Sequence, residues 1–248
     1  MKYSLESNSR FSMKPPRIIA IETSGRRGSV ALALGPDLVG RREFSADMQH
    51  ARDLLPEIDR LCREHQWRPD GIDQCYLSIG PGSFTGLRVA VAFARHFALA
   101  TAARTCAVPT LDVIAENGRN MEQPPEHLAV MLDAKRGQVF MALFVYDGEV
   151  YRRTVGPRMA EPAAMLAAAP APLAVIGEGI AFHRSAVEAS KAQILDSSLW
   201  WPTAAGVHQV GWRMACAGAF TEPTRLVPDY LRRPEAEELW EKRHGTES

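Results

Sequence analysis

Short apolar runs separated by polar turns dominate the first half of the chain and predict β-strands. Apolar residues at helical spacing predict an amphipathic helix over 51–62, and an alanine-rich run predicts a second helix over 89–103. A hairpin-led series of strands followed by alternating helices and strands is the pattern of a ribonuclease-H-like lobe. The predicted strands are 17–22, 29–34, 38–44, 73–79 and 105–108.

The second half partly repeats this order, with fewer and shorter helices. Its predicted strands are 128–132, 139–146, 149–155 and 173–176, and its predicted helices are 161–168 and 204–219, with a further helix opened by Gly177–Gly179. We therefore expect an α/β fold of two related ribonuclease-H-like lobes, the second one reduced. The expected division is an extension at 1–16, a first lobe at 17–107, a second lobe at 108–233 and a charged tail at 234–248, with the last long helix free to pack on the first lobe.

Charge and cysteine usage narrow the functional classes. The chain has 29 Lys plus Arg and 29 Asp plus Glu, so its formal net charge is zero. This balance argues against sequence-independent binding of nucleic acid, although it does not exclude a local basic patch. The first sixteen residues lack the apolar middle of a signal peptide, and no apolar run is long enough to span a bilayer. The four cysteines are scattered without a C-x-x-C pair, which favours buried reduced thiols and a cytoplasmic location.

The Gly-rich run Gly80–Arg88 stands between a predicted strand and a predicted helix. Such a turn can present backbone N–H groups to an anion. The simpler interpretation, which we prefer, is structural: Ser83 caps the following helix, and the glycines shape the turn.

Several longer motifs give the chain a family resemblance. They include Ile21–Ser24, Gln49–His50 with Leu54–Pro56, Gly80–Arg88, Val108–Leu111, Asp133–Val139 and Pro228–Arg232. In this order, over roughly residues 17–233, the chain resembles the TsaB (YeaZ) family. The Gly-Pro-Gly-Ser-Phe-Thr-Gly-Leu-Arg and Asp-Ala-Lys-Arg-Gly-Gln-Val runs together are specific, whereas either alone would only be suggestive.

The resemblance implies a fold, a function and a set of partners. The fold is the duplicated lobe of the sugar kinase, Hsp70 and actin superfamily. The function is a non-catalytic part in making threonylcarbamoyladenosine in tRNA, beside the catalytic paralogue TsaD. TsaC supplies the activated threonylcarbamoyl group, and TsaE is an associated ATPase. No cofactor of its own is expected, because ATP or ADP and the metal belong to the partners. A homodimer is expected for the chain alone, tRNA is reached through the complex, and no membrane is involved.

The sequence gives little support for a catalytic site in this chain. No two histidines are four residues apart, so the paired His ligands of a TsaD-like metal site are missing. We therefore expect neither catalytic nor metal-binding residues. A vestigial nucleotide loop stays open as a second interpretation of two turns, against a well-capped hairpin; its residues would be Glu22, Thr23, Ser24, Gly80, Gly82, Ser83 and Thr85.

The Asp133–Gly137 loop is expected to face the cleft between the lobes. Lys135 and Arg136 could attract tRNA phosphate there, or could be solvated loop residues. The family resemblance also implies that the helices at 51–62 and 89–103 form a four-helix interface with TsaD or with a second copy of the chain. The residues expected in that interface are Leu54, Leu55, Ile58, Leu61, Arg88, Val91 and Arg95. The alternative function is an autonomous ATP-dependent phosphotransferase or a protease-like hydrolase.

Overall fold

The structure is a computed structural model that describes residues 14–44 and 50–231. The predicted tail at 234–248 and nearly all of the predicted extension at 1–16 lie outside the described residues. So do Gln49 and Arg232, which belong to two of the family motifs.

The first sheet has five strands in the order β3-β2-β1-β4-β5. Its first strand pairs antiparallel with β2 and parallel with β4, while β2 pairs antiparallel with β3 and β4 pairs parallel with β5. This mixed sheet confirms the ribonuclease-H-like pattern predicted for the first half. The strands are β1 (Arg17–Glu22), β2 (Gly28–Leu34), β3 (Asp37–Phe44), β4 (Gln74–Gly80) and β5 (Arg104–Pro109).

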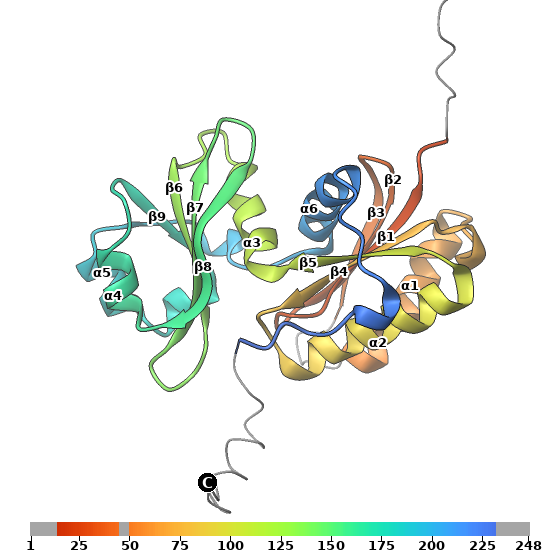
Figure 1. Ribbon diagram of the computed structural model, residues 1–248, viewed down its shortest axis with the longest axis horizontal. Helices are drawn as coiled ribbons and strands as arrows, with labels where there is room; N and C mark the ends of the chain where they lie inside the picture. The colour runs from red at the N-terminus through yellow and green to blue at the C-terminus, as the bar shows by residue number, and fades with distance from the viewer. Residues whose placement is uncertain (1–13, 45–49, 232–248) are drawn as a thin grey trace, which may run out of the picture.

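Helices cover both faces of the first sheet. Helices α1 (His50–Glu64) and α2 (Phe84–Thr101) lie on one face, and α6 (Ala204–Cys216) lies on the other (Figure 1). Strand β1 therefore has no exposed face: Ile19 and Ile21 belong to the core beneath α1 and α2, whereas the residues between and before them belong to the core beneath α6. A strand that is buried on both faces shows a continuous apolar run rather than alternation.

The second sheet repeats the connectivity of the first. Its order is β10-β9-β6-β7-β8, with β6 antiparallel to β7, β7 antiparallel to β8, and β9 parallel to both β6 and β10. Its helices α4 (Pro162–Ala167) and α5 (Arg184–Ala189) have six residues each, against 15 and 18 in α1 and α2, so this lobe is reduced. The strands are β6 (His127–Asp133), β7 (Val139–Tyr146), β8 (Tyr151–Ala160), β9 (Leu173–Ile176) and β10 (Gln193–Ile194).

The two lobes exchange their last helices. Helix α3 (Thr110–Arg119) follows the last strand of the first sheet and lies between the two sheets (Figure 1). Its Leu111 and Ile114 belong to the core of the second lobe. Conversely, α6 follows the last strand of the second sheet but packs on the first. Glu116 of α3 is 2% exposed and accepts hydrogen bonds from both Arg213 of α6 and Arg119, so a buried carboxylate ties the exchanged helices together.

Several predicted elements need correction. Helix α2 already begins at Phe84, so the second half of the Gly-rich run is helical rather than a turn. The third strand of the second lobe covers 151–160 instead of 149–155, and Gly177 precedes a single 3-10 turn (Glu178–Ala181). Helix α3 and the short strand β10 were not predicted.

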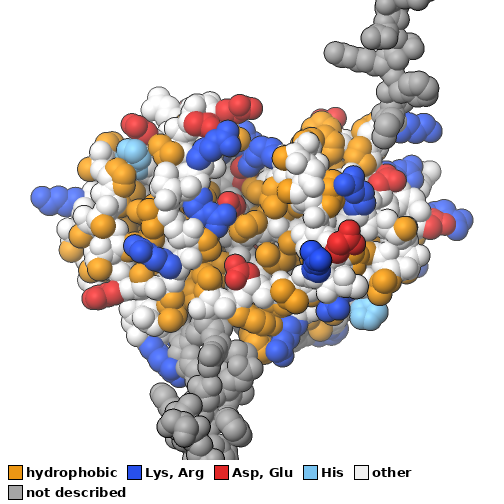
Figure 2. Space-filling view, in the orientation of Figure 1, with side chains coloured by type: hydrophobic (Ala, Val, Ile, Leu, Met, Phe, Trp, Pro, Cys, Tyr) orange, Lys and Arg blue, Asp and Glu red, His pale blue; other side chains and the backbone are white. Residues whose placement is uncertain are grey.

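The surface mixes charges of both signs. On the face shown in Figure 2, basic and acidic side chains are interspersed with apolar ones over both lobes. This distribution agrees with the zero net charge of the sequence. Among the described residues, no helix has the length and apolar character needed to cross a membrane.

Candidate functional site

The Gly-rich run joins β4 to α2. Ser83 is the residue before the helix, and its hydroxyl oxygen accepts a hydrogen bond from the Gly86 N–H at 3.2 Å. This confirms the predicted helix cap, which satisfies one of the N–H groups left without a partner in the first helical turn.

Two glycines of the run are required by close packing against the turn after β1. A Cβ atom on Gly86 would lie 1.8 Å from the Thr23 carbonyl oxygen, and one on Gly82 would lie 2.5 Å from the Ser24 carbonyl oxygen. The two turns are also hydrogen-bonded: the Thr23 hydroxyl donates to the Gly86 carbonyl at 2.7 Å, and the Ser83 N–H donates to the Ser24 carbonyl at 2.7 Å. The turns therefore form one packed unit, which brings together the residues predicted as a nucleotide loop, with Thr85 exposed at its edge.

The side chain of Glu22 lies buried beneath these two turns. Its side chain is 0% exposed, and its carboxyl group accepts hydrogen bonds from the Ser24 N–H, the Ser24 hydroxyl and the Ser78 hydroxyl. Burial raises the pKa of Glu22, although these hydrogen bonds and one from the Gly25 backbone act in the opposite direction. Backbone donors that a phosphate-binding turn would offer to its ligand are thus directed at the protein's own carboxyl group.

In the second lobe, the end of β6 and the turn after it bring several charged side chains together. The Asp133 carboxylate lies 3.0 Å from the Lys135 ammonium and 3.4 Å from His183 Nε2, and the Asp133 N–H donates to Glu178 at 3.3 Å. Burial opposes ionisation of Asp133, but hydrogen bonds and charge from Lys135, together with His183, hold its pKa below the usual range. Burial raises the pKa of Glu178, which the charge of Arg26 across the cleft partly offsets. Charged residues of both lobes therefore influence the pKa of Glu178.

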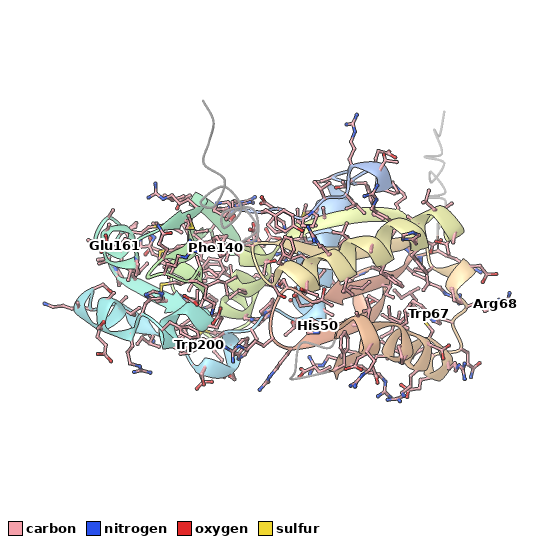
Figure 3. The ribbon with its side chains drawn as sticks, turned by 90° about the horizontal axis from the view of Figure 1, so that it is seen from below. His50, Trp67, Arg68, Phe140, Glu161 and Trp200 are labelled. Atoms are coloured by element: carbon pink, nitrogen blue, oxygen red, sulfur yellow. The ribbon has the colours of Figure 1, made fainter. Side chains whose placement is uncertain are left out.

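A cleft of about 620 Å³ lies between the lobes. The first lobe contributes both packed turns, and the second contributes Leu132–Arg136, so the Asp133–Gly137 loop does face the cleft as predicted. Aromatic side chains line much of the remainder, namely Phe84, Phe140, Phe182, Trp201 and Tyr230. Seen from below, Phe140 and Trp200 lie in the second lobe, and His50 lies on the part of the first lobe nearer to it (Figure 3).

The segment 219–231, which we call the C-terminal strap, forms another part of the cleft wall. It bridges to β5 through Thr221 and Thr105, and the Asp229 N–H donates to the Ile79 carbonyl at 2.7 Å. Tyr230 packs on Phe84 with ring centroids 5.0 Å apart, and its hydroxyl accepts a hydrogen bond from Arg88 Nε at 3.0 Å. In the sequence this segment was noted only for the family motif at 228–232. Its local pattern does not indicate that it packs beside the end of β4.

The structure corrects the expected apolar interface on α1 and α2. Four of the residues expected there, Leu54, Ile58, Leu61 and Val91, are at most 8% exposed and pack beneath the helices in the core of the first lobe. Their apolar spacing reflects contact with the sheet. Leu55 is 59% exposed, and Arg88 and Arg95 are also exposed, so these three lie on the outer surface.

The described residues were also examined for metal-binding clusters and for reactive thiols. Among these residues, no group of three or more His, Cys, Asp and Glu side chains is arranged to hold a metal ion. All four cysteines are free thiols, and Cys62, Cys75 and Cys106 are buried. Burial raises the pKa of Cys75 and Cys106 to about 12, so both remain protonated at neutral pH.

Comparisons with known proteins agree on one family. The family model described as "TsaD: tRNA N6-adenosine threonylcarbamoyltransferase" matches residues 44–240. The Bacillus subtilis tRNA threonylcarbamoyladenosine biosynthesis protein TsaB is 27% identical over 229 residues, covering 90% of this chain and 97% of that protein. An uncharacterized Mycobacterium tuberculosis protein is 30% identical over 230 residues, covering 90% and 94%.

Two solved structures have the same fold. A Pseudomonas aeruginosa protein described as uncharacterized, with similarity to peptidase YEAZ, superposes with a TM-score of 0.76 at 25% identity over 88% of this chain and 100% of its own. The structure of YeaZ from Pseudomonas aeruginosa superposes with a TM-score of 0.74 at 23% identity, over 87% and 99%. These matches run through both lobes, and the chain belongs to the TsaB (YeaZ) family, within the wider group that the TsaD family model describes.

Proposed function

We propose that this chain takes part in the biosynthesis of threonylcarbamoyladenosine in tRNA, as a non-catalytic subunit that binds and activates TsaD. The first part rests on the TsaB relatives, which align over nearly their whole length. The partners expected with TsaD are TsaE and, functionally, TsaC.

The single observation that carries the non-catalytic role is the state of Glu22. An acid that held a magnesium ion or activated a nucleophile would have to reach the cleft. The Glu22 carboxyl group instead has no exposed surface and is saturated by donors from its own turn and from Ser78. Ser83, the nearest candidate for a hydrolase nucleophile, uses its hydroxyl oxygen as a helix cap.

The surface proposed for TsaD is the outer face of α2. Arg88, Ala92, Arg95 and Leu99 follow the three- and four-residue spacing of one helix face, and all four are exposed. Leu99, in the last turn of α2, is 75% exposed, and Leu55 on neighbouring α1 is 59% exposed. Exposed leucines on two neighbouring helices, with Arg88 and Arg95 exposed on α2, suit a helix-on-helix interface that has both apolar and charged contacts.

Reconstitution tests the function. Purified TsaC, TsaD and TsaE are incubated with tRNA, threonine, bicarbonate and ATP, with and without this chain, and the modified nucleoside is measured by mass spectrometry. Loss of product only when the chain is omitted is the expected result. Unchanged product without the chain would contradict the proposal, and ATP turnover by the chain alone at an enzyme-like rate would favour the phosphotransferase alternative.

The interface is tested separately by substitution. Leu99→Glu places a charge on the proposed face and should weaken TsaD binding at least tenfold, because burying an unpaired carboxylate is costly. Leu38→Glu is the matched control, since Leu38 is 41% exposed on β3, outside the proposed face. Titration calorimetry with TsaD measures both. Equal binding by the two variants would place the interface elsewhere.

A further inference from the structure

The outer face of helix α2 is apolar and basic. Ala92, Arg95 and Leu99 follow the spacing of one helix face, and all three are exposed, Leu99 by 75%. The helix itself contains no Asp or Glu, and Arg95 forms no ion pair with any residue that the structure describes. An acidic amphipathic helix is the kind of partner that such a face fits.

The C-terminal strap brings the chain to the start of this helix. Tyr230 packs on Phe84, and its hydroxyl accepts a hydrogen bond from Arg88. The described part of the chain ends one residue later, at Leu231, where the strap passes the first turn of α2 (Figure 1). Residues 232–248 therefore follow directly from a contact with α2.

The sequence of 234–245 has the start and stop signals of a helix. Pro234 is a residue favoured at the first helical position, and Glu235, Glu237 and Glu238 suit the first turn. Basic residues occupy 242–244, the expected last turn, and Gly245 follows them. The pattern predicts a helix over 234–244.

This predicted helix is amphipathic. Ala236, Leu239 and Trp240 have the spacing i, i+3, i+4 and therefore share one face. At about 100° per residue, Glu235 and Glu237 flank that face on its two sides. The segment thus combines an apolar face with acidic flanks, which complements the apolar and basic face of α2.

The lengths of the two helices also agree. From Arg88 to Leu99, a helical rise of about 1.5 Å per residue gives roughly 16 Å along α2. From Leu231 to Leu239, an extended segment followed by a helix from residue 234 spans roughly 17 Å. Leu239 and Trp240 can therefore reach Leu99 without any change in the described part of the chain.

We propose that the C-terminal segment 232–244 folds back on the outer face of α2 as an amphipathic helix. Leu239 and Trp240 cover Leu99, and an acidic flank of the segment faces Arg95. The chain then carries its own cover for the surface that the proposed function assigns to TsaD. Docking is a property of the chain alone, whereas competition with TsaD rests on the proposed function.

Disulfide trapping in the full-length chain tests the docking. Leu99→Cys and Leu239→Cys are introduced together with Cys216→Ser, which removes the exposed native thiol; the other three native thiols are buried. Oxidised glutathione is the oxidant, and intact mass distinguishes a disulfide within one chain from one between two chains. The matched control pairs Leu239→Cys with Leu38→Cys, because Leu38 is 41% exposed on the edge strand β3.

We expect an intrachain disulfide that forms at least tenfold faster in the Leu99 pair than in the Leu38 pair. Arg95→Glu sets like charges against each other and should slow the reaction at least fivefold, and adding Glu235→Lys and Glu237→Lys should restore it. Thermal unfolding confirms that each variant is folded. Equal rates in the two pairs, a disulfide formed only between chains, or a rate insensitive to these charges would overturn the proposal.

TsaD binding separates this inference from the proposed function. Leu239→Glu removes the apolar contact of the segment, so the chain should bind TsaD severalfold more tightly when both ligands use the outer face of α2. Titration calorimetry measures this affinity. Trapping at Leu99 together with an unchanged TsaD affinity would support the docking and refute the assignment of this face to TsaD.

Discussion

At the scale of single residues, the carboxyl group of Glu22 connects three separate parts of the chain. It lies at the end of β1 and accepts hydrogen bonds from the turn that follows and from Ser78 on β4. Since the Glu22 side chain has no exposed surface, each of these bonds is made in a low-dielectric environment, where an unmade bond would be costly. Glu22 therefore holds the first hairpin turn against the sheet.

The first prediction concerns pH. Because burial raises the pKa of Glu22, the folded chain binds this proton more tightly than the unfolded chain does. The resulting stabilisation is present below the unfolded-state pKa and is lost as pH rises through the folded-state pKa. Glu22→Gln removes this titration, so its free energy of unfolding should fall less than that of the parent chain between about pH 5 and pH 8. Urea unfolding across this range measures the difference; the exposed Glu222→Gln should behave like the parent, and identical pH slopes for all three would refute the assignment.

The second prediction concerns the Gly-rich run. A Cβ atom at position 86 would lie 1.8 Å from the Thr23 carbonyl oxygen, so Gly86→Ala must push the two turns apart. We expect a loss of about 3 kcal/mol in the free energy of unfolding, which urea unfolding would measure. Gly71→Ala is the control, since its Cβ atom would meet only the end of the Arg17 side chain at 3.1 Å. Equal stability of the two variants would contradict the packing described.

At the scale of elements, the helices show what a sequence pattern can and cannot convey. The amphipathic pattern of α1 predicted the helix correctly, but its apolar stripe marks the face toward the sheet, where Leu54 and Leu61 are 2% exposed. Helix α3 was not predicted, although Asp112, Glu116 and Arg119 follow helical spacing; it is buried between two lobes, so its apolar residues face two cores and form no single stripe. Its Gly118, close against Leu128, also lowers its helix propensity.

The third prediction concerns the contact between α3 and α6. Glu116→Gln leaves the guanidinium groups of Arg213 and Arg119 without the buried carboxylate that they share. Breaking a fully buried pair costs more, but these arginines are partly exposed, so we expect about 2 kcal/mol of destabilisation. Chemical unfolding checks this value. Glu126→Gln, at a side chain that is 68% exposed, should change stability by less than about 0.5 kcal/mol, and a similar effect in both would show that the network contributes little.

At the scale of the whole molecule, the candidate site combines segments that no local pattern could connect. Sequence motifs indicated three of its parts, the turns at 22–24, 80–85 and 133–136, because turn residues are recognisable where they occur. Phe182 and Trp201 could not be identified in advance: an aromatic residue in a loop becomes part of a site only when the fold brings it there. Duplicated sheet order was predictable in outline, while the exchange of α3 and α6 depends on tertiary packing.

The fourth prediction follows from that exchange. A fragment of residues 1–109 contains every strand of the first sheet but lacks α6, whose Ala204, Val207 and Val210 cover one of its faces. We expect the fragment to show no cooperative thermal transition, and co-expression with residues 110–248 to recover a folded complex. Circular dichroism of both preparations provides the measurement. A cooperative transition of the fragment alone would show that the first lobe is an independent folding unit.

The exchange of helices also delays completion of the first lobe during synthesis on the ribosome. The first sheet ends at residue 109 and its covering helix ends at residue 216, 107 residues later. At translation rates of about 5–20 residues per second, roughly 5–20 s separate the two. Throughout that interval Ile18, Ala20 and Tyr76 lack the α6 residues that they pack against in the folded chain. We therefore expect the nascent chain to be prone to aggregation until residues 204–216 have been synthesised.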